Sequence, residues 1–97
     1  MTFELVVEPS AARDIADADA HYAQFGKADA FLSAIDNVFE QLTSTPLMYP
    51  AVHGDVRRAL LRRFPFSVFF IVERSRVFVL AVHHQRRDPA SRPRPGK

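Results

Sequence analysis

Apolar residues recur at every second position near the start of the chain, at Phe3, Leu5 and Val7. This period of two predicts a short strand with one buried face, which Pro9 ends. Ser10 is a favourable N-cap residue, so we expect a helix to begin at Ala11.

Two helical patterns follow this strand. Apolar residues recur at helical spacing from Ala11 to Phe25, and Gly26 predicts the end of the first helix. From Ala28 to Leu42 they are three or four positions apart, which is typical of an amphipathic helix. Because the connection is so short, we expect the two helices to form an antiparallel hairpin.

The second half of the chain returns to strand patterns. Residues 46–54 contain two prolines and a glycine and predict a loop. Residues 56–63 alternate and predict a strand, whereas residues 66–72 are nearly all apolar and predict a central strand covered on both faces. Residues 76–84 predict a further strand, joined to the previous one by a hairpin turn at residues 73–76.

This order of elements predicts an α+β fold with the sequence βααβββ. We expect the helical hairpin to pack on one face of a small, mainly antiparallel sheet and the basic side chains to lie on the other face. One domain is predicted over residues 1–89, followed by a mobile, basic, proline-rich tail at residues 90–97.

Composition narrows the class of protein. A chain of 97 residues suits one domain, and an apolar content of 47% permits a packed core. The absence of cysteine excludes a disulfide scaffold, a zinc–thiolate site and a cysteine nucleophile. The sequence shows no secretory signal and no apolar run near the ~20 residues of a membrane helix. We therefore expect a cytoplasmic protein without a membrane partner.

The net charge of +2 conceals two halves of opposite sign. Residues 1–50 carry a net charge of −6 and residues 51–97 carry +8. Eleven of the thirteen basic residues are arginine, which binds phosphate or carboxylate through two parallel hydrogen bonds. The basic half therefore indicates a polyanion or an acidic protein as partner, although such a face can also be merely solvated.

Metal and cofactor chemistry have no support in the sequence. The four histidines lack metal-ligand spacing, and the adjacent His83 and His84 point to opposite faces of a strand. No glycine-rich phosphate loop exists, and Ser67 lacks the setting of a serine nucleophile. We expect neither a metal nor a cofactor.

An arginine and histidine set in the second half remains as candidate chemistry. If the strands that carry it are neighbours, a histidine acting as base or acid and an arginine stabilising charge could cleave a phosphodiester. The 2′-hydroxyl of RNA would then supply the nucleophile. The same arginines could instead pair with carboxylates of a protein partner. The set comprises Arg57, Arg58, Arg62, Arg63, His83, His84, Arg86 and Arg87.

Two segments of this half resemble the RelE/ParE superfamily of toxins. They read V-R-R-A-L-L-R-R-F-P-F-S-V-F-F from Val56 and V-F-V-L-A-V-H-H-Q-R-R-D-P from Val77. The helical pattern before them is similar to the helical hairpin of the family, so the resemblance covers residues 3–89.

The resemblance implies a bacterial growth-inhibiting toxin, associated with plasmid stabilisation, in a hetero-oligomer with the antitoxin encoded beside it. RelE-like members cut mRNA on the ribosome, whereas ParE-like members share the fold and poison DNA gyrase without a nuclease site. Arg62 or Arg63 and Arg86 or Arg87 match basic positions of the nucleases, and His84 matches the histidine of the family. If the chain is a nuclease, the candidate catalytic residues are Arg63, His84 and Arg87. The resemblance leaves Arg57, Arg58, Arg62 and Arg86 as candidate partner-binding residues.

Departures from the nuclease pattern favour the ParE-like branch. Lysine is absent between residues 28 and 96, no tyrosine follows Tyr49, and Arg92 stands where the family often has tryptophan. The long helical hairpin also resembles ParE-like members. A third reading is a non-toxic remnant that still binds its antitoxin.

Overall fold

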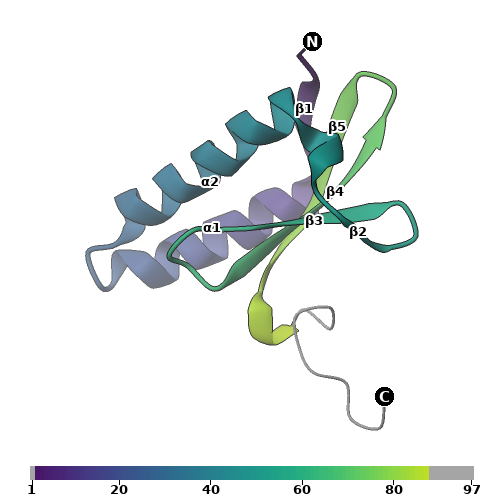
Figure 1. Ribbon diagram of the computed structural model, residues 1–97. Coiled ribbons are helices and arrows are strands. Elements are labelled where there is room, and N and C mark those ends of the chain that lie inside the picture. The colour runs from purple at the N-terminus through teal and green to yellow at the C-terminus, as the bar shows by residue number, and fades with distance from the viewer. Residues whose placement is uncertain (1, 88–97) are drawn as a thin grey trace, which may run out of the picture.

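The chain forms two layers, a helical hairpin and a sheet (Figure 1). The structure, a computed structural model, describes residues 2–87. Helices α1 (Pro9–Ala23) and α2 (Ala28–Ser44) pack on one face of the five-stranded sheet. This arrangement confirms the predicted α+β class. The predicted domain boundary at residue 89 and the predicted tail at residues 90–97 lie outside the described residues.

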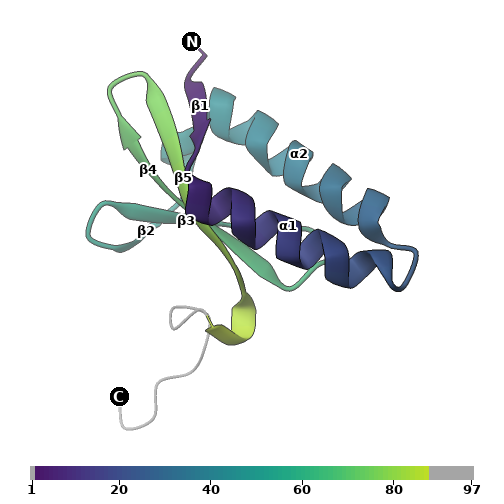
Figure 2. The same cartoon turned by 180° about the vertical axis from the view of Figure 1, so that it is seen from behind.

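The sheet has the strand order β1-β5-β4-β3-β2. Its strands are β1 (Glu4–Val7), β2 (Ala51–His53), β3 (Val56–Leu60), β4 (Phe66–Glu73) and β5 (Arg76–His84). Only β1 and β5 pair in parallel, and the other neighbours are antiparallel. Figure 2 shows α1 beginning where β1 ends, beside β5.

Strand β2 lies within residues 46–54, for which the sequence predicts a loop, so that prediction is wrong for these three residues. It pairs with β3 through Ala51↔Arg57 and His53↔Val56. Gly54 turns the chain between the two strands with a φ of +55°, a left-handed conformation that glycine adopts without steric cost. A three-residue strand after Pro50 is too short to show a period of two.

Helix α1 begins two residues earlier than predicted. Pro9 occupies the first turn, where its missing N–H costs nothing, and Glu8 is the N-cap residue. Ser10 therefore lies inside the helix, and its hydroxyl donates to the carbonyl of Leu80 in β5 at 2.8 Å. The prediction of Ser10 as a cap is wrong.

Strand β3 ends at Leu60, so the prediction of a strand through Arg63 is also wrong. Residues 61–65 form a loop in which Arg63 has a φ of +72° and Pro65 lacks an N–H for a ladder. The buried side chains of Leu61 and Phe64 fix this loop to the core.

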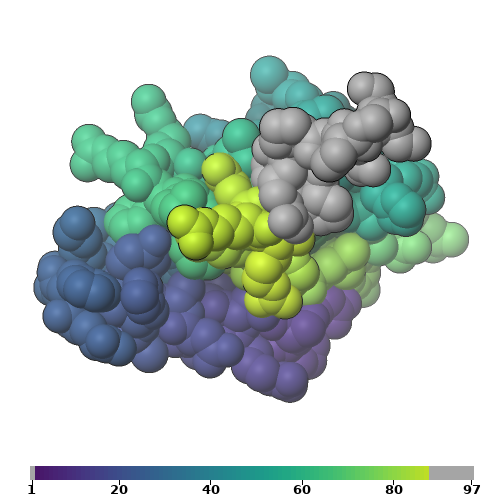
Figure 3. All heavy atoms as spheres, turned by 90° about the horizontal axis from the view of Figure 1, so that it is seen from below, coloured from purple at the N-terminus to yellow at the C-terminus, as the bar shows by residue number. Residues whose placement is uncertain are grey.

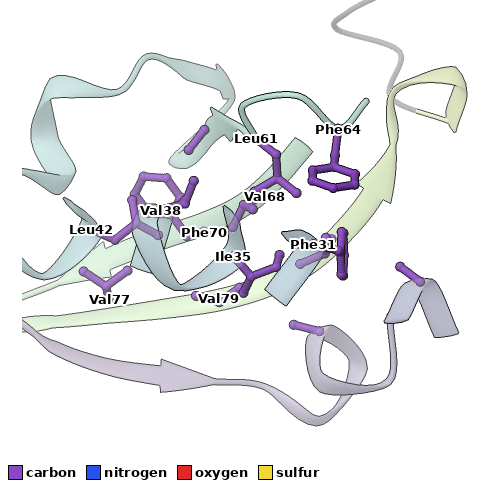
Figure 4. Packing of buried hydrophobic residues seen from close by; sticks show 14 residues of the cluster. Phe31, Ile35, Val38, Leu42, Leu61, Phe64, Val68, Phe70, Val77 and Val79 are labelled. Carbon is purple, nitrogen blue, oxygen red and sulfur yellow. The ribbon is translucent and has the colours of Figure 1, made fainter. Parts of the chain in front are cut away.

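The core lies between α2 and the sheet (Figure 4). Helix α2 contributes one apolar stripe, and strands β4 and β5 contribute the facing valines and Phe70. From α1, Ala11 and Ala18 are buried, and the partly buried Ile15 and Tyr22 also pack against the core. The labelled core residues are Phe31, Ile35, Val38, Leu42, Leu61, Phe64, Val68, Phe70, Val77 and Val79.

An aromatic cluster closes one end of this core. The ring of Tyr22 in α1 lies 5.2 Å from Phe31 and 4.9 Å from Phe64, and Phe31 lies 5.5 Å from Phe66. These contacts attach the tip of the helical hairpin to the loop at residues 61–65. The connection between two helices and the connection between two strands therefore meet at the same end of the molecule.

Candidate basic site

Three connecting segments come together at the end of the molecule closed by the aromatic cluster. They are the hairpin tip at residues 24–27, the loop at residues 61–65, and the short helix η2 (Gln85–Arg87). The backbone N–H of Gln85 donates to the carbonyl of Pro65 at 2.7 Å, which joins η2 to the loop. Figure 3 shows the tip in blue, the loop in green and η2 in yellow on the same side of the molecule.

These segments carry five exposed cations and no acidic residue. We call this group of side chains the basic end. Within residues 2–87, none of the five side chains forms a hydrogen bond or ion pair. The positive charge there is consequently uncompensated by the described residues. The basic end consists of Lys27, Arg62, Arg63, Arg86 and Arg87.

A groove of about 950 Å³ lies between α2 and the loop at residues 61–65. Lys27, Arg62 and Arg63 line it, and no acidic residue does. On the α2 side the lining is small or uncharged, from Ala30 to Gln41. An anionic chain in the groove would therefore meet three cations and no carboxylate, together with the apolar side chains of Leu60 and Phe64.

His84 occupies the edge of the basic end. It is half-buried, and its ring lies 5.3 Å from the ring of Phe66 in an edge-on contact. Its Nδ1 accepts the backbone N–H of Arg86 at 3.1 Å. This hydrogen bond assigns the proton of the neutral ring to Nε2, which can therefore donate a hydrogen bond to a bound group but has no lone pair with which to accept a proton.

The predicted nuclease set is brought to one end but does not form a connected site. Arg63 is in the loop, and His84 and Arg87 flank the join between β5 and η2. Within residues 2–87, no hydrogen bond or ion pair links His84 to either arginine. Only a bound phosphate that contacts all three side chains would connect them.

His83 points to the opposite face of the sheet from His84. Its ring lies 5.7 Å from Phe69, whereas His84 contacts Phe66 on the other face of β4. Its Nε2 lies 3.7 Å from the carboxylate of Asp14 in α1. The two adjacent histidines thus lie in different surroundings and do not bind a common ligand.

Arg57 and Arg58 do not belong to the basic end. Arg57 lies opposite Phe70 on the helix-covered face, and its Nη1 donates to the carbonyls of Tyr49 at 2.5 Å and Leu47 at 3.4 Å. The expectation that the basic side chains lie on the other face is therefore wrong for Arg57. Arg58 lies opposite Phe69, on the face away from the helices, and is half-buried.

Sequence reasoning missed Lys27, because a single lysine between two helices carries no motif. The ring contacts of Tyr22 and Phe31 with Phe64 show that the hairpin tip joins the arginine-bearing loop. Within residues 2–87, no three histidine, aspartate or glutamate side chains gather as metal ligands. In the same residues, no helix combines the length and apolar character needed to cross a bilayer.

Comparison with known proteins assigns the family. The family described as "ParE toxin of type II toxin-antitoxin system, parDE" matches residues 5–89. A solved structure titled "Chromosomal ParDE TA system from P. aeruginosa" is similar, with a TM-score of 0.72 and 22% identity over 86% of this chain and 96% of that chain. No curated protein matches the chain. Since the family match spans most of the sequence, the chain belongs to the ParE toxin family of type II toxin–antitoxin systems.

Proposed function

We propose that this chain is the toxin of a type II module, that it inhibits DNA gyrase in the bacterial cytoplasm, and that a cognate antitoxin neutralises it. The observation that carries this proposal is the family match over residues 5–89. The isolated position of His84 supports a binding role, because its Nδ1 is already occupied by the N–H of Arg86.

A ribosome-dependent endoribonuclease is the second candidate. It is favoured by the hydrogen bond from Gln85 to Pro65, which brings Arg63 and Arg87 to the same end as His84. In this mechanism the hydrogen bond from the N–H of Arg86 to Nδ1 of His84 would have to open before Nε2 could take a proton, while the guanidinium groups stabilise the charge of the reacting phosphate. The 2′-hydroxyl of the RNA would be the nucleophile.

Two measurements separate the candidates. Labelled amino-acid incorporation is followed in the first minutes after tightly controlled induction, and supercoiling by purified gyrase is measured with and without the chain. Continued translation with growth arrest and loss of supercoiling is the expected result. An immediate stop of translation with normal supercoiling would identify the ribosome, and not gyrase, as the target. Normal growth after induction would indicate that the chain is a non-toxic remnant that still binds its antitoxin.

The nuclease mechanism has its own test. A guanidinium that clamps the reacting phosphate should contribute at least tenfold to the rate, which corresponds to ~1.4 kcal/mol. Arg63→Gln, His84→Ala and Arg87→Gln should therefore each reduce mRNA cleavage in that mechanism. In the gyrase mechanism we expect His84→Ala to retain full toxicity.

The antitoxin contact is proposed at the edge of the sheet formed by β2. Strand β2 is at one edge of the sheet, where another chain can add a strand. Beside it the short helix η1 (Pro46–Met48) exposes 61% of Leu47 and 79% of Met48. An apolar segment of the antitoxin would cover both features.

Co-expression with the neighbouring gene tests this contact. We expect a stable complex and restored growth, and Leu47→Asp with Met48→Asp should weaken the complex at least tenfold. Leu32→Asp, which changes a leucine that is 38% exposed on α2, is the matched control and should leave the complex intact. Equal loss in both variants would exclude the β2 edge, and no complex with the unaltered chain would exclude neutralisation by that neighbour.

A further inference from the structure

The basic end combines three features that occur together in proteins that bind single-stranded nucleic acid. Its five cations are exposed, a groove runs beside them, and aromatic rings lie next to them. Cations that track the backbone and rings that stack on bases are the two components of such sites. Each component is placed here by a different segment of the chain.

The cations are arranged to follow a chain of phosphates. Lys27 comes from the hairpin tip, Arg62 and Arg63 from the loop, and Arg86 and Arg87 from η2. Lys27, Arg62 and Arg63 line one groove, and the hydrogen bond from Gln85 to Pro65 holds the two arginines of η2 beside the same loop. Four of the five are arginines, whose planar groups bind phosphate oxygens in pairs.

The acidic residues of α2 are turned away from the groove beside this surface. Asp29, Asp36 and Glu40 belong to the same helix, but none lines the groove. The lining from α2 is instead Ala30, Ser33, Ala34, Asn37, Val38 and Gln41. A phosphodiester backbone can therefore approach this side of α2 without meeting a carboxylate.

An exposed aromatic pair stands at the hairpin tip. Phe25 is 62% exposed, and its ring lies 5.3 Å from the ring of His21. Lys27 follows two residues later. An exposed phenylalanine beside cations offers a flat apolar surface on which an unpaired base can stack, at about 1–3 kcal/mol per base.

The surroundings favour nucleic acid over an acidic protein. Stable protein interfaces have an apolar centre within a polar rim. The strongly exposed Leu47 and Met48 lie beyond the C-terminus of α2, whereas the basic end lies beside its N-terminus. The exposed pair Leu47 and Met48 and the basic end are therefore at opposite ends of a 17-residue helix, while the exposed apolar side chains beside the cations are Phe25 and Leu60.

We propose that the basic end binds single-stranded nucleic acid without sequence preference, with Lys27 and the four arginines on phosphates and Phe25 stacked on a base. The proposal goes beyond gyrase inhibition and does not depend on it, because binding requires only this chain and an oligonucleotide. DNA and RNA share the phosphodiester backbone and unpaired bases, so the experiment includes both.

Fluorescence anisotropy of labelled 20-nucleotide DNA and RNA tests the proposal, with a 20-base-pair duplex for comparison, at several salt concentrations. We expect binding to single strands that weakens with salt, with a slope of about −0.7 in log K per log salt for each phosphate contact. Five contacts set an upper limit of about −3.5 on that slope. Duplex DNA should bind more weakly because its bases cannot stack on Phe25.

A pair of charge-matched variants locates the site. Arg62→Gln with Arg87→Gln removes two cations from the basic end, and Arg13→Gln with Arg74→Gln removes two exposed cations elsewhere. The first variant should reduce the magnitude of the slope by about 1.4 and bind at least tenfold more weakly. The control should change binding less than twofold. Equal effects of the two variants would show that the basic end is not the binding site.

Phe25→Ala tests the stacking component. It should weaken single-strand binding at least fivefold and leave duplex binding unchanged, while the melting temperature stays within a degree because the side chain is exposed. Duplex binding as tight as single-strand binding, or no effect of Phe25→Ala, would overturn the proposal. Binding of poly-glutamate but not of oligonucleotides would assign the surface to an acidic protein instead.

Discussion

The carboxylate of Asp14 in α1 accepts the backbone N–H of Val82 in β5 at 3.0 Å. Strand β1 pairs with β5 only as far as Val79, so the remaining edge of β5 lacks a neighbouring strand. Ser10 and Asp14, one helical turn apart, bind the carbonyl of Leu80 and this N–H. Side chains of α1 thus supply hydrogen-bond partners to the part of β5 that does not pair with β1.

Removal of this carboxylate should destabilise the fold. In Asp14→Ala the N–H of Val82, a residue that is 2% exposed, would lose its partner. An unpaired buried donor costs about 1–3 kcal/mol, so we expect the free energy of unfolding to fall by that amount. Urea denaturation monitored by circular dichroism measures the change.

Asp17→Ala is the control for Asp14→Ala, since Asp17 is an exposed residue on the same helix. It should change the free energy of unfolding by less than about 0.5 kcal/mol. Asp14→Asn keeps a carbonyl oxygen at the site and should lie between the two. If Asp14→Ala and Asp17→Ala unfold at the same urea concentration, the edge contact contributes nothing to stability.

Arg57 should act on stability and not on partners. Its guanidinium binds the carbonyls of Tyr49 and Leu47, so Arg57→Met would leave two polar groups of the η1 segment without their donor. We expect a loss of about 1–2 kcal/mol in the free energy of unfolding. Oligonucleotide affinity, measured in parallel, should change less than twofold.

Arg62→Met gives the reverse pattern, because Arg62 is exposed at the basic end. Its stability should stay within about 0.5 kcal/mol, while oligonucleotide affinity falls. The comparison distinguishes a structural arginine from a binding one on the same half of the chain. If Arg57→Met is as stable as the unaltered chain but binds the oligonucleotide more weakly, Arg57 is a partner-binding residue.

Phe31 should be the most sensitive position in the aromatic cluster. It is fully buried and contacts rings from α1, from the loop and from β4. Phe31→Ala should cost about 3–5 kcal/mol, through lost burial and the cavity that remains. Its neighbour Leu32 is exposed, so Leu32→Ala should cost under about 1 kcal/mol by the same urea measurement. Similar costs for both would argue against this packing of α2.

The parts of the fold that were predictable from sequence are those with a whole buried face. Helix α2 and strands β4 and β5 show clear periods because their apolar residues pack against one another. Strand β2 has only three residues and no buried side chain, so it leaves no period to read. Ser10 was misassigned because Pro9 can itself open a helix, which places the serine inside the first turn.

The candidate site was predictable only in its residue types. Charge asymmetry and the arginine pairs identified the basic half, and strand alternation placed His83 and His84 on opposite faces. Alternation could not place Arg62 and Arg63, because β3 stops at Leu60 before it reaches them. Nor could it show that Lys27 joins the same surface, since that depends on the packing of Tyr22 against Phe64.

Alkaline pH should destabilise the fold through Tyr49. Its hydroxyl donates to Oε1 of Gln41, and burial raises the pKa of Tyr49 above the ordinary value of 10.0. The folded state therefore favours the neutral phenol. The stability gained from this preference is complete below pH 10 and is lost as pH rises through the raised pKa, because the unfolded chain ionises first.

Urea denaturation at pH 8 and pH 11 measures this effect, with Tyr49→Phe as the matched variant. Phenylalanine keeps the ring, which lies 5.9 Å from Phe70, and removes only the ionisable hydroxyl. We expect Tyr49→Phe to be less stable than the unaltered chain at pH 8, because it lacks the bond to Gln41. The difference should shrink or reverse at pH 11. Tyr22→Phe controls for ionisation of the second tyrosine. A difference that stays constant between the two pH values would mean that Tyr49 ionises equally in the folded and unfolded chains.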